Sequence, residues 1–122
     1  MQKTDTALPQ IGAAFEGGIY AGLTIHDNTP MALVLLAGDV EDKQWKDAIT
    51  WAKDQGGELP SRFDALVLFT NLRSEFKDYD YWLATPDAGD DAAWCQDFDG
   101  GGQFYWHKDS ELRARAVRRV II

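Results

Sequence analysis

Hydrophobic and polar residues change their spacing twice along the chain, and each change predicts a different kind of element. The first runs, residues 15–26 (FEGGIYAGLTIH) and 31–36 (MALVLL), are rich in residues that favour β-strands. The DNTP between them has the composition of a turn. The two runs therefore predict a β-hairpin.

Apolar residues then recur with the period of an α-helix. Trp45, Ala48, Ile49 and Ala52 are spaced i, i+3, i+4 and i+7, which predicts a helix from about residue 43 to residue 55. A Gly-Gly pair follows, and glycine readily adopts the left-handed conformation that often ends a helix.

A second helix is predicted to begin after Pro60, where Ser61 and Asp64 have the spacing of a capping box. We expect it to end near Lys77 and to bury one broad face. The residues expected on that face are Phe63, Leu66, Val67, Phe69, Thr70, Leu72 and Phe76.

From residue 78 onward, short strand-like runs alternate with turn residues. The runs are YDYWLAT, AAWCQDF, GQFYWHK and RARAVRRVII. A hairpin, two helices and a twisted antiparallel sheet of short strands with long loops predict an α+β fold. We expect one domain, residues 11–122, preceded by a flexible polar segment, residues 1–10.

Charge is distributed unevenly along the chain, whose formal net charge is −8. Residues 78–99 contain seven aspartates and no basic residue, whereas residues 113–119 contain four arginines and no acid. We expect the arginines to pair with the acidic segment inside the fold. The net charge disfavours direct binding to nucleic acid or to an anionic membrane.

Four stretches, in this order, resemble one family. WKDAITWAKDQGGELPSR resembles the segment that opens the helical part of the Lcl-type domain, and YWLAT resembles its Y-W-S-S strand. AAWCQDFDGG and RARAVRRV resemble its A-W-x-x-x-F-x-x-G strand and turn and its closing R-x-R-A-V-R-R strand. This domain of unknown function is widespread in bacterial surface proteins and phage-encoded proteins, and it is similar to the C-type-lectin-like fold.

The resemblance implies a C-type-lectin-like fold whose last strands and loops form a ligand-binding platform. By position, that platform comprises residues 78–80, 86–91 and 99–110. The candidate partner-binding residues are Asp78, Asp80, Asp87, Asp90, Asp91, Asp99, Gln103, Tyr105 and His107.

Metal-dependent binding is not expected from the motifs present. The E-P-N, Q-P-D and W-N-D triplets that supply calcium ligands in many C-type lectins are absent from the sequence. Asp97 and Asp99 share one side of a predicted strand, but the further acids of a calcium loop are missing. We therefore expect no metal and no cofactor.

Enzymatic activity is not expected either. Cys95 lies within a predicted strand, where a lone cysteine is usually a small buried hydrophobic residue. A dyad with His26 or His107, assembled in space, stays an open alternative. No serine elbow, P-loop or dinucleotide-binding motif is present in the sequence.

Three consecutive aromatic residues, Phe104, Tyr105 and Trp106, fall on one predicted strand. Because side chains alternate between the faces of a strand, at least one of the three must point away from the core. We expect Tyr105 to point outward and contact a partner, while the inward residues build the core.

Other residues are expected to have structural roles. Arg113, Arg115 and Arg119 share one face of the last predicted strand, and Arg118 lies on the other. We interpret these arginines as holding acidic loops through carboxylate pairs. The residues expected to be structural are Arg113, Arg115, Arg118, Arg119, Trp45, Trp82 and Trp94.

Two function hypotheses follow. The first is a non-enzymatic binding module, encoded by a phage or prophage, that recognises a protein or glycan through its C-terminal strands and loops. The second is a small acidic intracellular inhibitor of a host protein, in which aspartates imitate the phosphates of nucleic acid to counter host defence. We expect a location in the host cytoplasm or the virion, because the sequence shows neither a Sec signal nor an apolar run long enough to span a membrane.

Overall fold

The computed structural model describes residues 7–89 and 91–122, and these residues form nine strands and two α-helices. The predicted α+β class is confirmed. Asp90 lies outside the described residues, as does part of the expected N-terminal segment. The elements are β1 (Ala14–Phe15), β2 (Gly18–His26), β3 (Thr29–Leu35), β4 (Val40–Lys43), α1 (Trp45–Asp54), α2 (Arg62–Leu72), a 3₁₀ turn (Arg73–Glu75), β5 (Asp80–Pro86), β6 (Ala92–Asp97), β7 (Gln103–His107), β8 (Leu112–Ala114) and β9 (Val117–Ile121).

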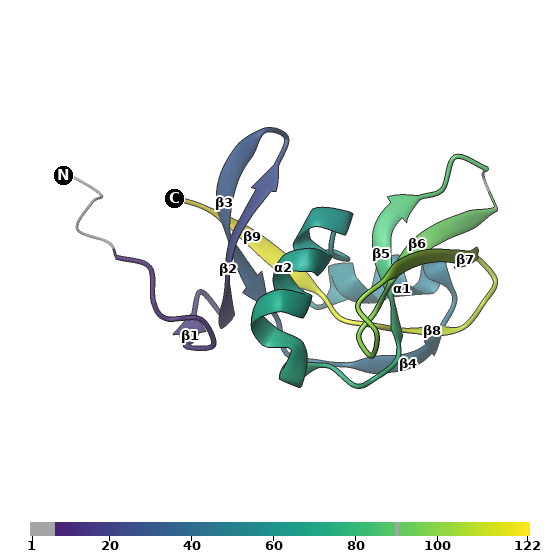
Figure 1. Ribbon diagram of the computed structural model, residues 1–122, viewed down its shortest axis with the longest axis horizontal. Coiled ribbons are helices and arrows are strands. Elements are labelled where there is room, and N and C mark those ends of the chain that lie inside the picture. The colour runs from purple at the N-terminus through teal and green to yellow at the C-terminus, as the bar shows by residue number, and fades with distance from the viewer. Residues whose placement is uncertain (1–6, 90) are drawn as a thin grey trace.

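The first sheet has the strand order β1–β2–β3–β9, and these neighbours are antiparallel. β2 and β3 form the predicted hairpin, which turns at Asp27 and Asn28 with φ angles of 51° and 62°. Aspartate and asparagine adopt this left-handed conformation more readily than other residues that carry a side chain. β9 pairs with β3, so the last strand completes the sheet that the hairpin begins (Figure 1).

The second sheet has the strand order β4–β8–β5–β6–β7 and lies beside the first (Figure 1). β5, β6 and β7 form an antiparallel meander, as predicted. β8 pairs with β5 in parallel, through Tyr81 and Arg113, so the expectation of a wholly antiparallel sheet is wrong here. The parallel pair arises because the connection from β7 carries the chain back across the sheet before β8 begins (Figure 1).

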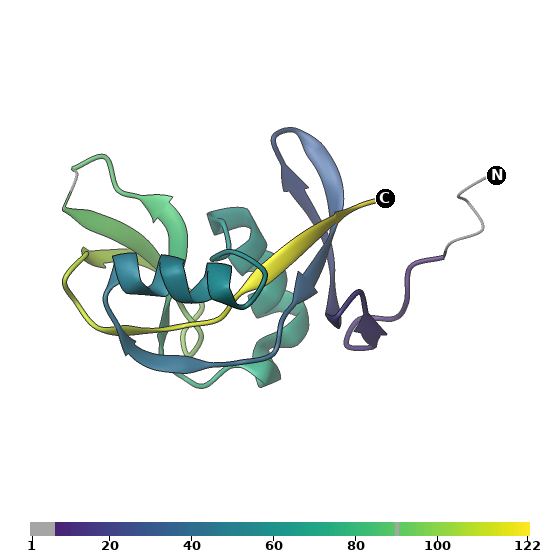
Figure 2. The same cartoon turned by 180° about the vertical axis from the view of Figure 1, so that it is seen from behind.

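The first helix follows its predicted pattern. α1 buries Ala48 and Ala52 completely against the core, and it is seen in front of the sheets when the molecule is viewed from behind (Figure 2). Gly56 ends the helical segment with a φ of 86°, in the left-handed region expected of this glycine.

The second helix begins as predicted but buries a different face. The backbone N–H of Asp64 donates to Ser61 Oγ at 3.0 Å, and the backbone N–H of Ser61 donates to Asp64 Oδ2 at 2.9 Å. Phe63 and Leu66 are 46% and 50% exposed, so the predicted buried face is wrong at these residues and at exposed Thr70. Asp64 is fully buried instead, because its hydrogen bonds fix the rotation of α2 about its axis.

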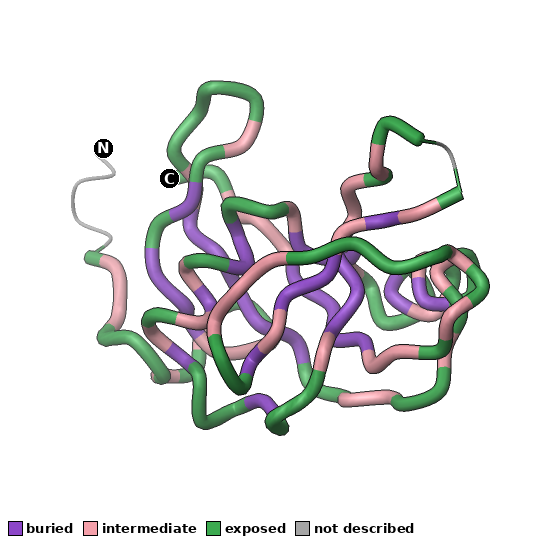
Figure 3. Tube along the Cα trace, turned by 45° about the vertical axis from the view of Figure 1, so that its right-hand side comes forward, coloured by how far each residue is buried: buried purple, intermediate pink, exposed green. Residues whose placement is uncertain are grey.

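Two hydrophobic clusters lie on opposite faces of β3. Val34 points to the first cluster with Ala48 of α1, whereas Leu35 points to the second with Leu68 of α2. This alternation follows from the two-residue period of a strand. Figure 3 shows the result: buried segments run through the interior, and exposed segments form the hairpin tip and the outer loops.

Two of the tryptophans expected to be structural anchor the first cluster. Trp82 is fully buried, and its Nε1 donates to the carbonyl of Lys43 at 2.7 Å. Trp45 is half-buried, packs against the same cluster, and donates from Nε1 to the carbonyl of Leu83 at 2.8 Å. Both indole N–H groups therefore keep a partner while their rings lie in apolar surroundings.

The run RARAVRRVII does not form the single strand that was predicted. It splits into β8 and β9, which belong to different sheets. Between them the chain passes through the interior, and residues 114–117 are all buried in succession. Arg118 and Arg119 are consecutive on β9 and lie on opposite faces, as predicted. The face that Arg119 was predicted to share with Arg113 and Arg115 is wrong, because strict alternation requires one continuous strand.

The arginines also have partners other than those predicted. Arg113 pairs with Asp39 at 3.0 Å and with Glu41 at 3.2 Å. Arg119 pairs with Glu58 at 2.7 Å and with Asp64 at 2.6 Å. These carboxylates precede residue 78, so the expected pairing of these two arginines with residues 78–99 is wrong. The fold instead brings Arg113 to two acids that precede α1, and Arg119 to one acid that follows α1 and one in the first turn of α2.

The remaining two arginines of the run lie in different surroundings. Arg115 donates to the carbonyls of Glu75 and Leu36 at 2.6 and 2.7 Å. Arg118 lies beside the β1–β2 turn, where its Nη2 is 3.3 Å from the position that a Cβ would occupy on Gly17.

The Asp64 carboxylate joins three parts of the fold. It caps α2, accepts a hydrogen bond from Thr24 of β2 at 2.5 Å, and pairs with Arg119 of β9. The side chain of Arg119 is 4% exposed and that of Asp64 is fully buried. Removing one member of a buried pair strands the charge of the other, which destabilises more than the pair itself stabilises.

We predict that Asp64→Ala lowers the free energy of unfolding by about 3–5 kcal/mol, measured by chemical denaturation. The loss combines the broken helix cap with the loss of the buried partner of Arg119, which keeps only the exposed Glu58. Asp54→Ala, at the exposed end of α1, is the matched control and should change stability by about 0.5 kcal/mol or less. Equal effects of the two substitutions would contradict the central role of Asp64.

Candidate binding surface

β7 lies at the edge of the second sheet and is hydrogen-bonded to β6 on one side. Its other side carries a row of backbone N–H and C=O groups with no strand beside them in the described sheet. Such an edge can accept a further strand from another molecule.

All three consecutive aromatic residues of β7 are half-exposed. The exposed fractions are 50% for Phe104, 57% for Tyr105 and 47% for Trp106. The prediction that the inward-facing ones build the core is therefore wrong, whereas the exposure of Tyr105 agrees with expectation. α2 packs against β5 and β6 and reaches β7 through hydrogen bonds between Arg62 and Gln103, at the start of that strand.

Trp94 belongs to this surface rather than to the core that was predicted for it. It lies opposite Tyr105 across β6 and β7, with the ring centroids 5.3 Å apart in an edge-to-face arrangement. The Arg62 guanidinium lies 3.7 Å from the centroid of the Trp94 ring. Arg62 is in turn held by Gln103, which accepts from its Nε at 2.9 Å. Gln103 thus holds the Arg62 side chain in its position over the Trp94 ring.

The aspartates expected on the platform are placed around β7. Asp80 lies on β5 and accepts a hydrogen bond from Trp106 Nε1 at 3.0 Å. Asp99 is exposed in the turn between β6 and β7, and Asp87 and Asp91 lie in the loop that precedes β6. We call β7, Trp94 and Asp80, together with these two loops, the β7 surface.

His107 and Asp91 meet at one end of the β7 surface. They line a pocket of about 310 Å³ together with Trp45 and Lys108. The backbone N–H of Lys108 donates to the carbonyl of Asp91 at 2.7 Å, which fixes the loop against the strand. Asp78, also predicted, is exposed just before β5, and Asp90 lies outside the described residues.

Sequence reasoning missed several residues of this surface. Phe104 and Trp106 were assigned to the core, and Arg62 on α2 was not considered. The run of three aromatic residues marked the first two as candidates, but their exposure depends on the edge position of the strand, which the sequence does not show. The position of Arg62 could not be inferred, because it depends on how α2 packs on the sheet.

The remaining candidate chemistry finds little support among residues 7–89 and 91–122. Cys95 is fully buried, and burial raises the pKa of its thiol to about 12, so the nucleophilic thiolate is scarce at neutral pH. No group of three or more His, Cys, Asp and Glu side chains that could hold a metal ion is found in these residues. No helix in this part of the chain has the length and apolar character needed to cross a membrane.

Comparison with known proteins adds no family assignment. No protein-family model matches the sequence, and no curated protein matches it significantly.

Asp80 gives a pH-dependent signature of the β7 surface. Partial burial raises the pKa of Asp80, the hydrogen bond from Trp106 lowers it, and nearby Asp97 raises it, with a net shift upward from 3.8. The folded state therefore holds this proton more tightly than the unfolded state. Its contribution to stability is present below pH 3.8 and is lost as the pH rises through the folded pKa.

We predict that Asp80→Asn becomes more stable relative to the unmodified protein as the pH rises from about 3 to about 7. The amide keeps an oxygen that can accept from Trp106 but does not ionise. The measurement is the midpoint of thermal unfolding of both proteins across this range. A difference in midpoint that stays constant with pH would contradict the raised pKa.

Proposed function

We propose that this protein is a non-enzymatic binding module that recognises a partner protein through the β7 surface. The proposal includes the C-type-lectin-like architecture and the phage or prophage origin that the sequence resemblance implies. The observed order of hairpin, two helices and second sheet supports that architecture. β7, Asp80 and the loop before β6 lie within the stretches that the resemblance implies as a platform, whereas Trp94 lies outside them.

One observation carries the proposal: three consecutive aromatic side chains are half-exposed on a free edge strand. Large aromatic side chains are enriched among the residues that dominate binding energy at protein interfaces. The edge adds backbone hydrogen-bonding groups, which suit a polypeptide better than a glycan. The Trp94–Arg62 and Trp106–Asp80 contacts hold the surface in place before binding, which lowers the entropy lost on association.

A second candidate function is supported by the arginine pairs. Arg113 and Arg119 pair with acids outside residues 78–99, so neither arginine reduces the negative field that the exposed aspartates of that segment create around β7. A field of this kind fits a basic groove on a host protein, as expected of an inhibitor that imitates nucleic acid. The two functions use the same surface but differ in which interaction dominates.

We predict that Tyr105→Ala and Trp106→Ala each weaken partner binding by about tenfold or more. Capture of partners from host lysate by the immobilised protein identifies the partner, and titration of the purified partner gives the affinity. Leu23→Ala is the matched control, because Leu23 is 51% exposed but lies on β2 of the first sheet. If both aromatic variants bound the partner as tightly as the control, the β7 surface would not be the binding site.

The salt dependence of that affinity separates the two candidates. We predict a steep loss of affinity with rising salt for an imitation of nucleic acid, and a shallow one for an aromatic contact surface. The double variant Asp91→Asn, Asp99→Asn should flatten a steep dependence. The double variant Asp27→Asn, Asp54→Asn removes the same charge from exposed sites at the hairpin tip and the end of α1, and it should leave the slope unchanged.

A further inference from the structure

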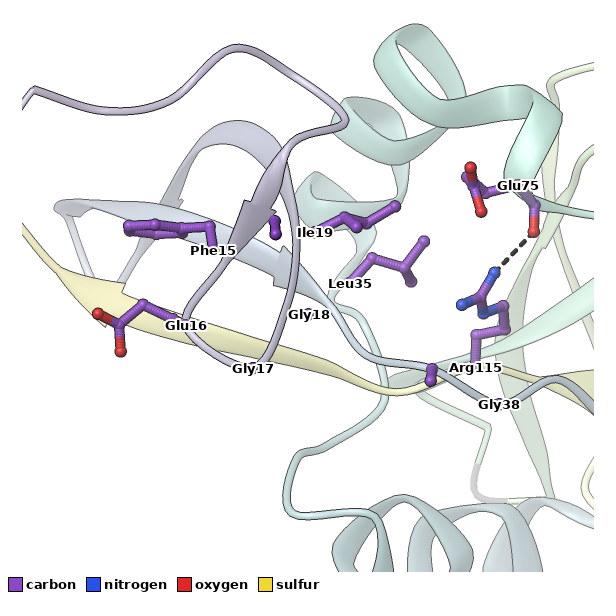
Figure 4. A pocket seen from close by; sticks show the side chains of 11 residues that line it. Phe15, Glu16, Gly17, Gly18, Ile19, Leu35, Gly38, Glu75 and Arg115 are labelled. Atoms are coloured by element: carbon purple, nitrogen blue, oxygen red, sulfur yellow. Dashed lines mark hydrogen bonds between the residues drawn. The ribbon is translucent and has the colours of Figure 1, made fainter.

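A pocket of about 710 Å³ opens beside the β1–β2 turn and the residues that follow β3. Figure 4 shows the Arg115 side chain at one end of it and Phe15 at the other, with Ile19 and Leu35 between them. β1 and β7 lie at opposite ends of the molecule in Figure 1, so this pocket is separate from the β7 surface. The inference below does not rest on the proposed function.

Arg115 is buried at this pocket without a carboxylate partner. The residue is 8% exposed, and among the described residues no ion pair forms with its guanidinium. Two backbone carbonyls accept from its terminal nitrogens, and its Nε has no hydrogen-bond partner in the described part of the chain. A guanidinium carries five N–H donors, so these two carbonyls leave donors unused.

Nearby acids do not neutralise this charge directly. The Asp39 carboxylate is occupied by Arg113 and by the hydroxyl of Tyr81, which donates to it at 2.5 Å. Glu75 contacts Arg115 through its backbone carbonyl, and its side chain is at the exposed rim. Burial lowers the pKa of Arg115, and the nearby Asp39 and Glu75 charges offset only part of this effect. The guanidinium also lies 5.3 Å from the centroid of the Phe76 ring, which supplies no hydrogen-bond acceptor in the plane of the guanidinium.

We propose that this pocket binds the carboxylate group of an apolar ligand, with the carboxylate on Arg115 and the hydrocarbon part against Phe15, Ile19 and Leu35. Arginine and carboxylate match in geometry and can form two parallel hydrogen bonds. A bound anion would compensate the positive charge of the guanidinium, which is costly to bury in surroundings of low dielectric constant. The apolar side chains that line the pocket favour a ligand that also has a hydrophobic part.

The rim of the pocket restricts the charge of the ligand. Glu16 and Glu75 also line it, Glu16 beside Phe15 and Glu75 beside Arg115 (Figure 4), so they bring negative charge to both ends. A phosphate or another polyanion is repelled by both, whereas a monocarboxylate carries only the charge that Arg115 compensates. The ligand is therefore a singly charged carboxylate, supplied by a free apolar acid or by the carboxyl terminus of an apolar peptide.

Two pairs of probes test the ligand class and separate its sources. Octanoate is compared with octanamide, and the peptide acetyl-Leu-Leu-Phe with its C-terminal amide, each titrated into the intact protein and followed by the NMR shifts of Ile19 and Leu35. We expect each acid that binds to shift these signals, and its amide to bind at least about tenfold more weakly. Binding of octanoate alone identifies a free acid, and binding of the peptide alone identifies a carboxyl terminus. No shift with either acid, or equal binding of acid and amide, overturns the proposal.

Three variants test the position of the ligand. Arg115→Met should abolish the preference for acid over amide, and Ala37→Trp should block the pocket from an exposed position on its rim without disturbing Arg115. Glu75→Gln should tighten acid binding by a few-fold, because it removes a repelling charge while keeping the backbone carbonyl. Glu111→Gln removes the same charge from an exposed site outside the pocket and should leave binding unchanged. If Arg115→Met does not fold, the other two variants decide, and unchanged binding in both overturns the proposal.

Discussion

The carboxylate of Asp64 is the point at which the fold is held together. It begins α2, fixes the rotation of that helix, and holds β2 and β9 against it through Thr24 and Arg119. The Asp64 side chain is fully buried, so its charge is tolerated only because these partners satisfy it. Because Asp64 faces inward, Phe63 and Leu66 on the same helix face outward. One polar interaction therefore decides which apolar residues form the core.

The sequence predicted the elements well where short-range chemistry determines them. The hairpin depends on two turn residues, the first helix on an apolar stripe, and the second helix start on the Ser61–Asp64 box. The predictions were wrong where tertiary contacts decide which strands pair. Nothing within RARAVRRVII indicates that it serves two sheets, because alternation of side chains describes a single strand and carries no information about its neighbours.

The candidate binding surface could be located from sequence but not resolved into its parts. The density of aspartates and aromatic residues indicated the region around residues 78–107. The stacking of Trp94 under Arg62 depends on how α2 packs on the sheet, and the exposure of both Phe104 and Trp106 depends on the position of β7 at a sheet edge. Strand order is a long-range property, and local patterns cannot supply it. The same limit explains why the partners of Arg113 and Arg119 were misassigned.

The pairing of β3 with β9 has a consequence for how the chain acquires its structure. It aligns Met31 with Ile121, so a strand that is made early has to wait for a partner that lies far downstream in the chain. Until then, the two faces of β3 that pack into the two hydrophobic clusters are covered only in part. The apolar hairpin is therefore exposed to other chains. Contacts of such large sequence separation slow folding, because a long loop must close before they form. The growing polypeptide is thus most vulnerable to aggregation before β9 emerges from the ribosome.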